Sequence, residues 1–505
     1  MAKIFNYGED SLTVEIALDL VSGKQKGVIT PQTREKVHNC YQEVQKIANG
    51  DKLVYAINTG FGSLCTTRIS KKDVNKLQEN LLKSHSVGVG DAIPFDTAKL
   101  MLILKLQSLC MGYSGVSEAI VDRIVWHINE NYIPLVPEQG SVGASGDLAP
   151  LSHLFLPLIG LGKLQRKDLP FKDTRQILNQ AGLSPIALGP KEGLALINGT
   201  QFMAAFGVMI THKLKSCLDH ADIIGAMSVE GLLGSAKPFV KRLHQIRPHQ
   251  GAITVAKRLS ALLEDSGFMA YHAHCDRVQD PYSLRCMPQV HGASRDACLH
   301  LKQQVECEIN SVTDNPVIFS ADDAVSGGNF HGQPIALPMD YAGLAASELG
   351  NISDRRSYLL LEGKIELPIY LIKNSGVNSG LMIAQYCSAA LASENKSLCF
   401  PASADSIPTS LGQEDHVSMG SISGRKTLRI IDNLEKILSV EMLCAAQAID
   451  FRRPNKSSII LETCLEEVRK QIPHIEEDLE VHQLINQSLK LIQSGKLLEL
   501  TSNLD

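Results

Sequence analysis

Apolar residues recur at helical spacing over long stretches of the second part of the chain. This spacing, close to 3.6 residues, predicts one long helix in each of five segments. The segments are 201–233, 291–311, 336–360, 376–399 and 424–449. Short polar loops separate them, and long helices joined in this way are typical of a helical bundle. We therefore expect a mainly α protein whose residues 201–505 form a domain of long central helices and C-terminal helices.

The first 200 residues carry shorter apolar runs, which polar and glycine-rich loops interrupt. Residues 12–50 predict one or two surface helices, and the apolar positions from Thr97 to Asn131 predict core helices broken around Gly112 to Gly115. Residues 163–190 form a polar excursion. We expect residues 1–200 to be an N-terminal domain of mixed helices and loops.

Composition places the chain among soluble globular proteins. Of 505 residues, 44% are apolar and 20% charged, with a formal net charge of −5. A field this weak favours neither nucleic acid nor an anionic membrane as a partner, so we expect a small-molecule ligand. The N-terminal residues lack a basic region followed by an apolar core, and no long uncharged apolar stretch occurs. We expect a cytoplasmic protein without a membrane partner.

The 12 cysteines are scattered and include no C-x-x-C pair. This distribution argues against a disulfide framework and against a zinc ribbon. The nearest approach to a metal cluster is His272-Ala273-His274-Cys275, which lacks the second pair of ligands that a closed tetrahedral site needs. We expect reduced thiols and no metal.

A glycine-rich run from Gln139 to His153 carries the most informative chemistry. It reads Gln-Gly-Ser-Val-Gly-Ala-Ser-Gly-Asp-Leu-Ala-Pro-Leu-Ser-His. A phosphate-binding loop would contain a lysine, and this run has none. A hydrolase nucleophile turn would read G-x-S-x-G, but Gly146 follows Ser145 directly. Apart from an ordinary glycine-rich connection, the remaining interpretation is a reaction of the backbone itself.

The tripeptide Ala144-Ser145-Gly146 has the residue types for a self-condensation. Glycine lets its nitrogen approach the Ala144 carbonyl, alanine leaves that carbonyl unhindered, and serine carries a β-hydroxyl that can leave. Attack of the Gly146 nitrogen on the Ala144 carbonyl, with loss of water from the ring and from Ser145, leaves an exocyclic methylidene. Because no natural side chain is a good electrophile, a protein must borrow one or build one. Asp147 is placed to assist the proton transfers.

The full run closely resembles the signature of the aromatic amino acid ammonia-lyases, and of their histidine branch in particular. Matching stretches extend from about residue 50 to 455. They are Tyr55 to Gly62, Gly140 to His153, Glu192 to Thr200, Gln279 to Arg285, Gly328 to Gly332 and Gln413 to Met419. The resemblance implies that the tripeptide becomes a methylidene-imidazolone (MIO) prosthetic group with no external cofactor. It also implies a long-helix bundle like that of fumarase and aspartase, and a homotetramer whose sites draw on more than one subunit.

The resemblance further implies non-oxidative elimination of ammonia from an α-amino acid. The family places a loop tyrosine, here Tyr55, as the base for the β-proton, and Tyr282 is a second phenol of the site. An ordinary tyrosine, with a pKa of about 10, needs neighbours that lower that pKa if it is to act near pH 7. The sequence leaves open which group is the base, and whether the amine or the imidazole attacks the electrophile.

Other positions match family residues around the substrate and the prosthetic group. Arg285 offers a planar bidentate donor for the substrate carboxylate. Asn198 and Gln279 match residues that hydrogen-bond the substrate or the prosthetic group. Phe330 matches a residue packed close to the MIO loop, and Asp147 matches a carboxylate tied to prosthetic-group formation.

Two residues bear on which amino acid is used. His85, in Ser84-His85, matches a position near the substrate side chain, and an imidazole there can hydrogen-bond another imidazole. Glu414 stays charged at neutral pH and can pair with imidazole, whereas it would be stranded against a phenyl ring. Both favour L-histidine as substrate and urocanate as product. The chain departs from the histidine branch at Leu411-Gly412, where Ala-Asn is usual.

Three alternatives remain open at this stage. A tyrosine or phenylalanine ammonia-lyase, or an aminomutase, would share nearly every residue named. A helical scaffold that has lost catalysis would show a broken tripeptide or no Tyr55, and this sequence keeps both. A lyase of the fumarase and aspartase type would share the helices but lack the electrophile.

Overall fold

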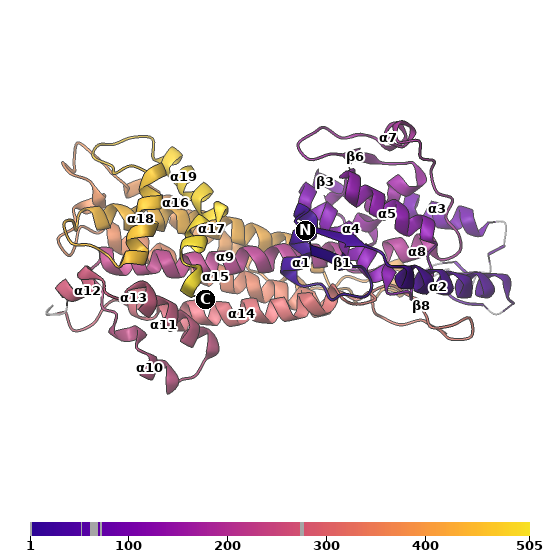
Figure 1. Cartoon of the computed structure of the whole chain (residues 1–505), viewed down its shortest axis with the longest axis horizontal. Helices are drawn as coiled ribbons and strands as arrows, with labels where there is room; N and C mark the ends of the chain where they lie inside the picture. Colours follow the sequence, from indigo (N-terminus) through magenta and orange to yellow (C-terminus); the bar gives the residue numbers. More distant parts are fainter. Residues whose placement is uncertain (1–2, 52, 61–68, 71–72, 273–276, 505) are drawn as a thin grey trace. The chain divides into compact units, whose positions relative to one another are not determined.

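The computed structural model describes residues 3–51, 53–60, 69–70, 73–272 and 277–504, and it is mainly helical, as expected (Figure 1). The chain forms two compact units, each made of separate segments. Unit 1 comprises Met1–Ile210, Leu301–Asp340 and Pro401–Arg425, and unit 2 comprises Thr211–His300, Tyr341–Phe400 and Lys426–Asp505. Four long helices run through the boundaries. They are α9 (Gln201–Gly231), α14 (Met287–Glu308), α15 (Gln333–Leu361) and α17 (Gly420–Asp450).

This division differs from a single cut at residue 200. Chain segments around residues 301–340 and 401–425 group with the N-terminal residues in unit 1. The physical reason is that each long helix carries the chain from one unit into the other and later segments carry it back, so residues far apart in sequence belong to the same unit. A hydrophobic pattern reveals the helices but not these returns.

Unit 1 contains half of the shorter α-helices and all the strands that the described residues form. Its helices are α1 (Val14–Ser22), α2 (Pro31–Asn49), α3 (Val74–His85), α4 (Phe95–Cys110), α5 (Glu118–Glu130), α6 (Leu148–Phe155), α7 (Thr174–Gln180) and α8 (Glu192–Ile197). Its strands are β1 (Lys3–Asn6), β2 (Gln25–Val28), β3 (Val89–Ala92), β4 (Ile133–Pro134), β5 (Pro137–Gln139), β6 (Lys163–Gln165), β7 (Lys172–Asp173), β8 (Val317–Ile318) and β9 (Ala324–Val325). The pairs are β1 with β2 in parallel, and β3 with β5, β4 with β6, β6 with β7 and β8 with β9 antiparallel.

Helix α4 forms the centre of unit 1. Every residue from Thr97 to Cys110 is buried, because apolar residues occur on all sides of the helix rather than on one face. Helix α4 ends at Cys110 and α5 begins at Glu118, so the predicted break around Gly112 to Gly115 is confirmed. The polar residues that α4 carries into this core must find partners inside the protein.

Unit 2 holds most of each long helix and the C-terminal helices. Its further helices are α10 (Lys241–Gln245), α11 (Gln250–Leu262), α12 (Gly267–His272), α13 (Tyr282–Arg285), α16 (Met382–Leu398), α18 (Ile459–Gln471), α19 (Val481–Ser494) and α20 (Lys496–Leu500). The five predicted long helices are confirmed as α9, α14, α15, α16 and α17. Helix α16 begins later than predicted, at Met382, because Gly376 and Gly380 adopt left-handed backbone angles.

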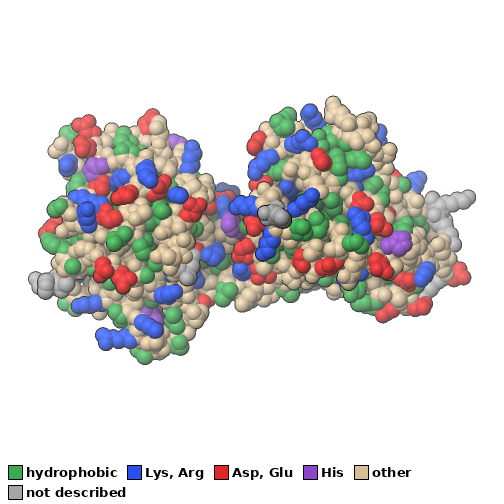
Figure 2. Space-filling view, in the orientation of Figure 1, with side chains coloured by type: hydrophobic (Ala, Val, Ile, Leu, Met, Phe, Trp, Pro, Cys, Tyr) green, Lys and Arg blue, Asp and Glu red, His purple; other side chains and the backbone are tan. Residues whose placement is uncertain are grey.

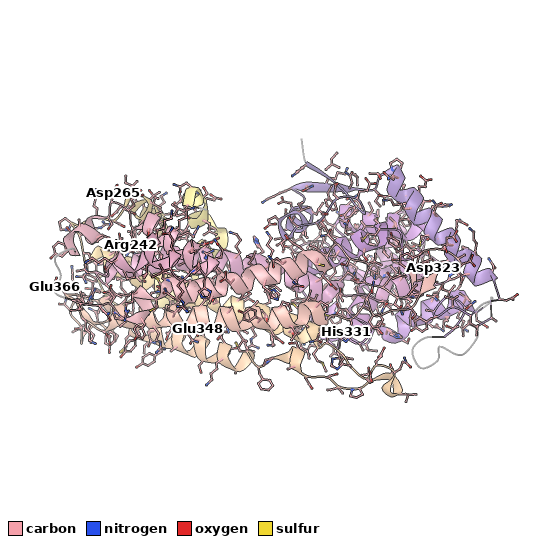
Figure 3. All side chains as sticks on the ribbon, turned by 90° about the horizontal axis from the view of Figure 1, so that it is seen from below. Arg242, Asp265, Asp323, His331, Glu348 and Glu366 are labelled. Carbon is pink, nitrogen blue, oxygen red and sulfur yellow. The ribbon has the colours of Figure 1, made fainter. Side chains whose placement is uncertain are left out.

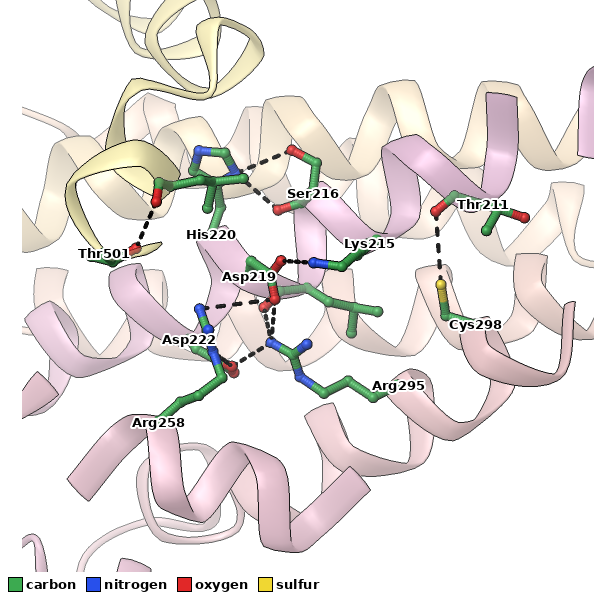
Figure 4. Close-up of polar contacts among 12 residues, drawn as sticks. Thr211, Lys215, Ser216, Asp219, His220, Asp222, Arg258, Arg295, Cys298 and Thr501 are labelled. Carbon is green, nitrogen blue, oxygen red and sulfur yellow. Dashed lines mark hydrogen bonds and ion pairs between the residues drawn. The ribbon is translucent and has the colours of Figure 1, made fainter. Parts of the chain in front are cut away.

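A buried ion cluster ties helices of unit 2 together (Figure 4). Asp222 of α9 accepts from Arg258 of α11 at 3.0 Å and pairs with Arg295 of α14. Asp219 pairs with Arg295 and with Lys215, both at 2.8 Å. The second oxygen of Asp222 contacts the Nδ1 atom of the buried His291 at 2.9 Å. Opposite charges are therefore matched within the cluster.

The described helices include none long and apolar enough to cross a membrane. On the face shown in Figure 2, Lys and Arg side chains are interspersed with Asp and Glu. This mixture agrees with the modest net charge of −5.

Candidate active site

The glycine-rich run forms the loop between β5 and α6 of unit 1. Its backbone takes left-handed φ angles at Gly143 (+79°), Ser145 (+54°) and Gly146 (+79°). A left-handed serine is uncommon and costs about 1 kcal/mol or more, and such residues concentrate at functional sites. Helix α6 begins at Leu148, so Asp147 is the last residue before the chain becomes helical.

Gly146 lies directly against Gly199. The two glycines form a parallel bridge, and the Asp147 N–H donates to the Gly199 carbonyl oxygen at 2.7 Å. A Cβ atom on Gly146 would lie 2.1 Å from that same oxygen. Only glycine permits this approach, so the third residue of the tripeptide is fixed by packing as well as by chemistry.

Asn198 holds the middle residue of the tripeptide. Asn198 follows the last residue of α8, and its side-chain amide donates to the Ser145 carbonyl oxygen at 2.7 Å. Its own main-chain carbonyl oxygen accepts from the Lys105 ammonium at 2.6 Å. The side-chain oxygen of Asn198 is buried and has no partner among the described residues.

Glu414 reaches the same serine from a distant part of the chain. The Ser145 hydroxyl donates to Glu414 Oε1 at 3.0 Å. Glu414 Oε2 accepts from the hydroxyls of Thr409 and Ser410, both at 2.9 Å. Thus two hydroxyls orient one carboxylate oxygen, and the other faces the tripeptide.

His85 ends helix α3 and lies within electrostatic reach of Glu414. Burial lowers the pKa of His85, while a backbone hydrogen bond with Leu81 and the Glu414 carboxylate act in the opposite direction. The Ser84 hydroxyl lies 3.0 Å from His85 Nδ1. The structure therefore brings His85, Glu414, Ser145 and Asn198 into one region of unit 1.

Asp147 is fully buried beside the first turn of α9. The Met203 N–H donates to its Oδ2 at 3.0 Å, whereas Oδ1 has no partner among the described residues. Burial raises the pKa of Asp147 to about 7, with Glu308 acting in the same direction. Backbone N–H groups of α9 and the charge of Lys105 oppose that rise. A carboxyl group of this kind can hold or release a proton near neutral pH.

Tyr55 and Phe330 are each half-buried residues of unit 1 loops. Tyr55 lies in a turn, and the following residues of its predicted loop, Phe61 to Leu64, lie outside the described residues. Phe330 precedes His331, labelled in Figure 3, whose Nε2 lies 3.2 Å from the His416 carbonyl oxygen. The Phe330 loop thus runs beside the Glu414 loop.

Gln279, Tyr282 and Arg285 belong to unit 2 and lie together. Arg285 donates to the side-chain oxygen of Gln279 at 3.0 Å, and its guanidinium carbon is 4.7 Å from the Tyr282 ring centroid. Tyr282 is 71% exposed. Of the His272 to Cys275 cluster, Ala273, His274 and Cys275 lie outside the described residues.

Sequence reasoning missed Lys105, Thr409 and Ser410, which hydrogen-bond Asn198 or Glu414. The signal for Lys105 was available, because it is a charged residue inside the otherwise apolar run from Leu100 to Leu106. No such signal exists for Thr409 and Ser410, since hydroxyl residues in a polar loop are ordinary.

A family model described as aromatic amino acid lyase matches residues 12–470. The chain is 46% identical to a histidine ammonia-lyase of Myxococcus xanthus over 493 residues, which is 97% of this chain and 96% of that one. The solved histidine ammonia-lyase of Trypanosoma cruzi is 39% identical, with a TM-score of 0.91 over 99% of this chain and 95% of that chain. A tyrosine aminomutase from Streptomyces globisporus is 33% identical, with a TM-score of 0.93 over 99% and 98%.

The fold and the loop therefore define a helical lyase. The chain belongs to the aromatic amino acid lyase family.

Proposed function

We propose that this enzyme acts as a histidine ammonia-lyase, which eliminates ammonia from L-histidine and gives trans-urocanate. The observation that carries the proposal is the Glu414 carboxylate, held by two hydroxyls and 3.0 Å from the Ser145 hydroxyl. A carboxylate there can pair with an imidazole, and an aromatic hydrocarbon ring could not satisfy it. Curated relatives named histidine ammonia-lyase, which are 46%, 47% and 42% identical to this chain, support the same choice.

The residues at the loop fit an MIO group made from Ala144, Ser145 and Gly146. Gly146 is pressed against Gly199, Ser145 has a left-handed backbone, and Asn198 donates to the Ser145 carbonyl oxygen that the condensation would retain. Once formed, the group would supply an electrophilic carbon to the substrate amine or imidazole. Its electron withdrawal would make the amine a better leaving group or the β-proton more acidic. Asp147 would assist its formation, and Phe330 would crowd the loop.

The remaining side chains have distinct proposed tasks. Tyr55 takes the β-proton, and Tyr282 assists proton transfer or positioning. Glu414 and His85 hold the imidazole of the substrate through hydrogen bonds. Arg285 binds the substrate carboxylate in a bidentate manner, with Asn198 and Gln279 as further hydrogen-bonding partners.

We propose a cytoplasmic homotetramer in which each site combines residues of more than one subunit. The exposure of Tyr282, next to Gln279 and Arg285 in unit 2, supports a role for these residues in another subunit's site. Light scattering on the purified protein tests the tetramer, and a monomer with full activity would contradict it. Neither nucleic acid nor membrane is proposed as a partner.

The test of substrate is turnover on three amino acids. Histidine, tyrosine and phenylalanine are supplied separately and the unsaturated product of each is followed by its ultraviolet absorbance. We expect fast turnover of histidine only. Clear turnover of tyrosine without turnover of histidine would overturn the proposal, and a β-amino acid product would identify an aminomutase.

The test of the prosthetic group is an intact mass of the purified protein. Condensation removes two water molecules, about 36 Da, from the peptide that contains residues 144–146. If peptide mapping of active enzyme shows ordinary amide bonds at these residues, the MIO assignment is wrong.

A further inference from the structure

Lys105 is a buried lysine in the centre of unit 1. Lys105 is 1% exposed, and it lies on α4, whose side chains are buried on every side from Thr97 to Cys110. A buried ammonium is costly unless an opposite charge pairs with it. No carboxylate in the described part of the chain forms an ion pair with Lys105.

A second buried lysine shows how this protein treats a structural cation. Lys191 is also fully buried, but its Nζ lies 2.7 Å from Asp314 and donates to the Ser114 carbonyl oxygen at 2.8 Å. Lys105 instead donates to the Asn198 carbonyl oxygen at 2.6 Å and lies 3.5 Å from Gln201 Oε1. Its partners are neutral, and the nearer of them is a residue of the active-site loop region.

The contacts of Asn198 lead from Lys105 to the tripeptide. Lys105 Nζ donates to the main-chain oxygen of Asn198, and the side-chain amide of Asn198 donates to the Ser145 carbonyl oxygen at 2.7 Å. Asn198 therefore lies between the two: Lys105 holds its main chain, and its side-chain amide holds the carbonyl in the middle of Ala144-Ser145-Gly146. The Asn198 segment has little other freedom, because Gly199 is pressed against Gly146.

We propose that Lys105 is a positioning residue of the active site, which fixes Asn198 so that its amide donates to the Ser145 carbonyl oxygen. This inference rests on the proposed lyase function. Lys105 acts on the main chain of Asn198, and the neutral side-chain amide of Asn198 makes the contact with Ser145. The cost of burying Lys105 is then explained by its action on Ser145 rather than by folding.

The electrostatic surroundings agree with this role. Burial lowers the pKa of Lys105 to about 7, Asp314 and Asp147 act to raise it, and Lys191 acts to lower it. The neighbouring carboxylates oppose this fall only in part, and the amine form of Lys105 can donate to the Asn198 carbonyl oxygen as the ammonium form does.

The test compares Lys105→Met with a matched control, Lys99→Met. Methionine has a similar length and packs well in an apolar core. Lys99 lies on the same helix, is also buried and donates to Asn131 Oδ1 at 2.6 Å, and among the described residues it hydrogen-bonds none of the site. Two quantities are measured in the full chain: kcat on histidine per condensed site, and the ultraviolet absorption band of the condensed loop.

We expect Lys105→Met to lower kcat per condensed site about tenfold, with KM changed less than about twofold, and to shift the absorption band. Its melting temperature should stay unchanged or rise, because an unpaired buried charge has been removed. Lys99→Met should leave kcat and the band unchanged. If Lys105→Met matches Lys99→Met in both quantities, or loses only stability, Lys105 is structural and the proposal is wrong.

A double-variant comparison tests whether Lys105 acts through Asn198. In an Asn198→Ala background, Lys105→Met should lower kcat less than about twofold, because the amide it positions is gone. An equal tenfold fall in both backgrounds would overturn the proposal. Failure of the proposed lyase function would give a different result, because the intact mass of the unmodified chain would then show no loss of water.

Discussion

Two buried polar regions of this protein are built in opposite ways. In the ion cluster of unit 2, both oxygens of Asp222 have cationic or imidazole partners, and Asp219 pairs with Lys215 and Arg295. In the loop region of unit 1, Asp147 and Lys105 are buried without an ion pair among the described residues, and Asp147 Oδ1 has no partner. Matched charges hold helices together in unit 2, whereas the loop region of unit 1 keeps buried polar groups with unused bonding capacity.

The pKa values of the two aspartates follow from this difference. Burial acts to raise the pKa of Asp222, but Arg295, His291 and Arg258 together hold it well below its ordinary range. Burial also raises the pKa of Asp147, and there no adjacent cation reverses the effect, so it reaches about 7. The same residue type is thus locked as an anion in one unit and left able to exchange a proton in the other.

The largest expected effect comes from the loop side of the comparison. Ser145→Ala removes the hydroxyl that must leave, so we expect turnover to fall by at least about 10⁴-fold, equivalent to ~5.5 kcal/mol. The melting temperature should not fall, and the mass should show no loss of two waters. Ser141→Ala, four residues earlier in the same loop, is the control. Near-full turnover of Ser145→Ala would show that the electrophile assignment is wrong.

The second effect tests the cluster side. Asp222→Ala removes the carboxylate that Arg258, Arg295 and His291 share and leaves only Asp219 for the two guanidinium groups, so we expect a loss of about 3–5 kcal/mol in the free energy of unfolding. Denaturant titration measures this loss. Asp432→Ala, which removes a half-exposed partner of Lys213, should cost no more than about 1 kcal/mol. Equal losses in the two variants would contradict a structural role for matched charges.

The third effect concerns substrate choice. Glu414→Gln keeps the shape but removes the charge opposite the proposed imidazole, so kcat/KM for histidine should fall about 10- to 100-fold. Stability should change little, since the carboxylate is held only by hydroxyls. Asp415→Asn, at an exposed neighbouring position, serves as control. A loss of stability larger than the loss of histidine turnover would argue against a role in substrate binding.

The fourth effect is a change in the pH dependence of stability. The ordinary pKa of an aspartate is 3.8, and Asp147 in the folded protein has one of about 7. Between these values the folded state holds a proton that the unfolded chain has released, so the contribution of Asp147 to stability falls as pH rises from about 4 to 7. Asp147→Asn should remove this decline. Unfolding titrations at several pH values measure it, with the exposed Asp322→Asn as control.

Much of the fold and of the site could be predicted from the sequence. Helical periodicity located the five long helices, and the Ala144 to Asp147 motif located the loop that gathers Asn198 and Glu414. The discontinuous units could not be predicted, because periodicity does not say which helix ends meet. Lys105 was overlooked because apolar neighbours made α4 resemble an ordinary core helix. The roles assigned to Tyr55, Tyr282, Phe330 and Arg285 stay predictions.

The four helices shared by both units also limit how the gene can be divided. A fragment that ends near residue 200 would keep Ser145 but lose Glu414 and Phe330, and it would lack segments that complete its own compact unit. A reporter insertion, or a split of the chain for complementation, should therefore be tolerated in exposed loops within one unit. It should not be tolerated near residue 200.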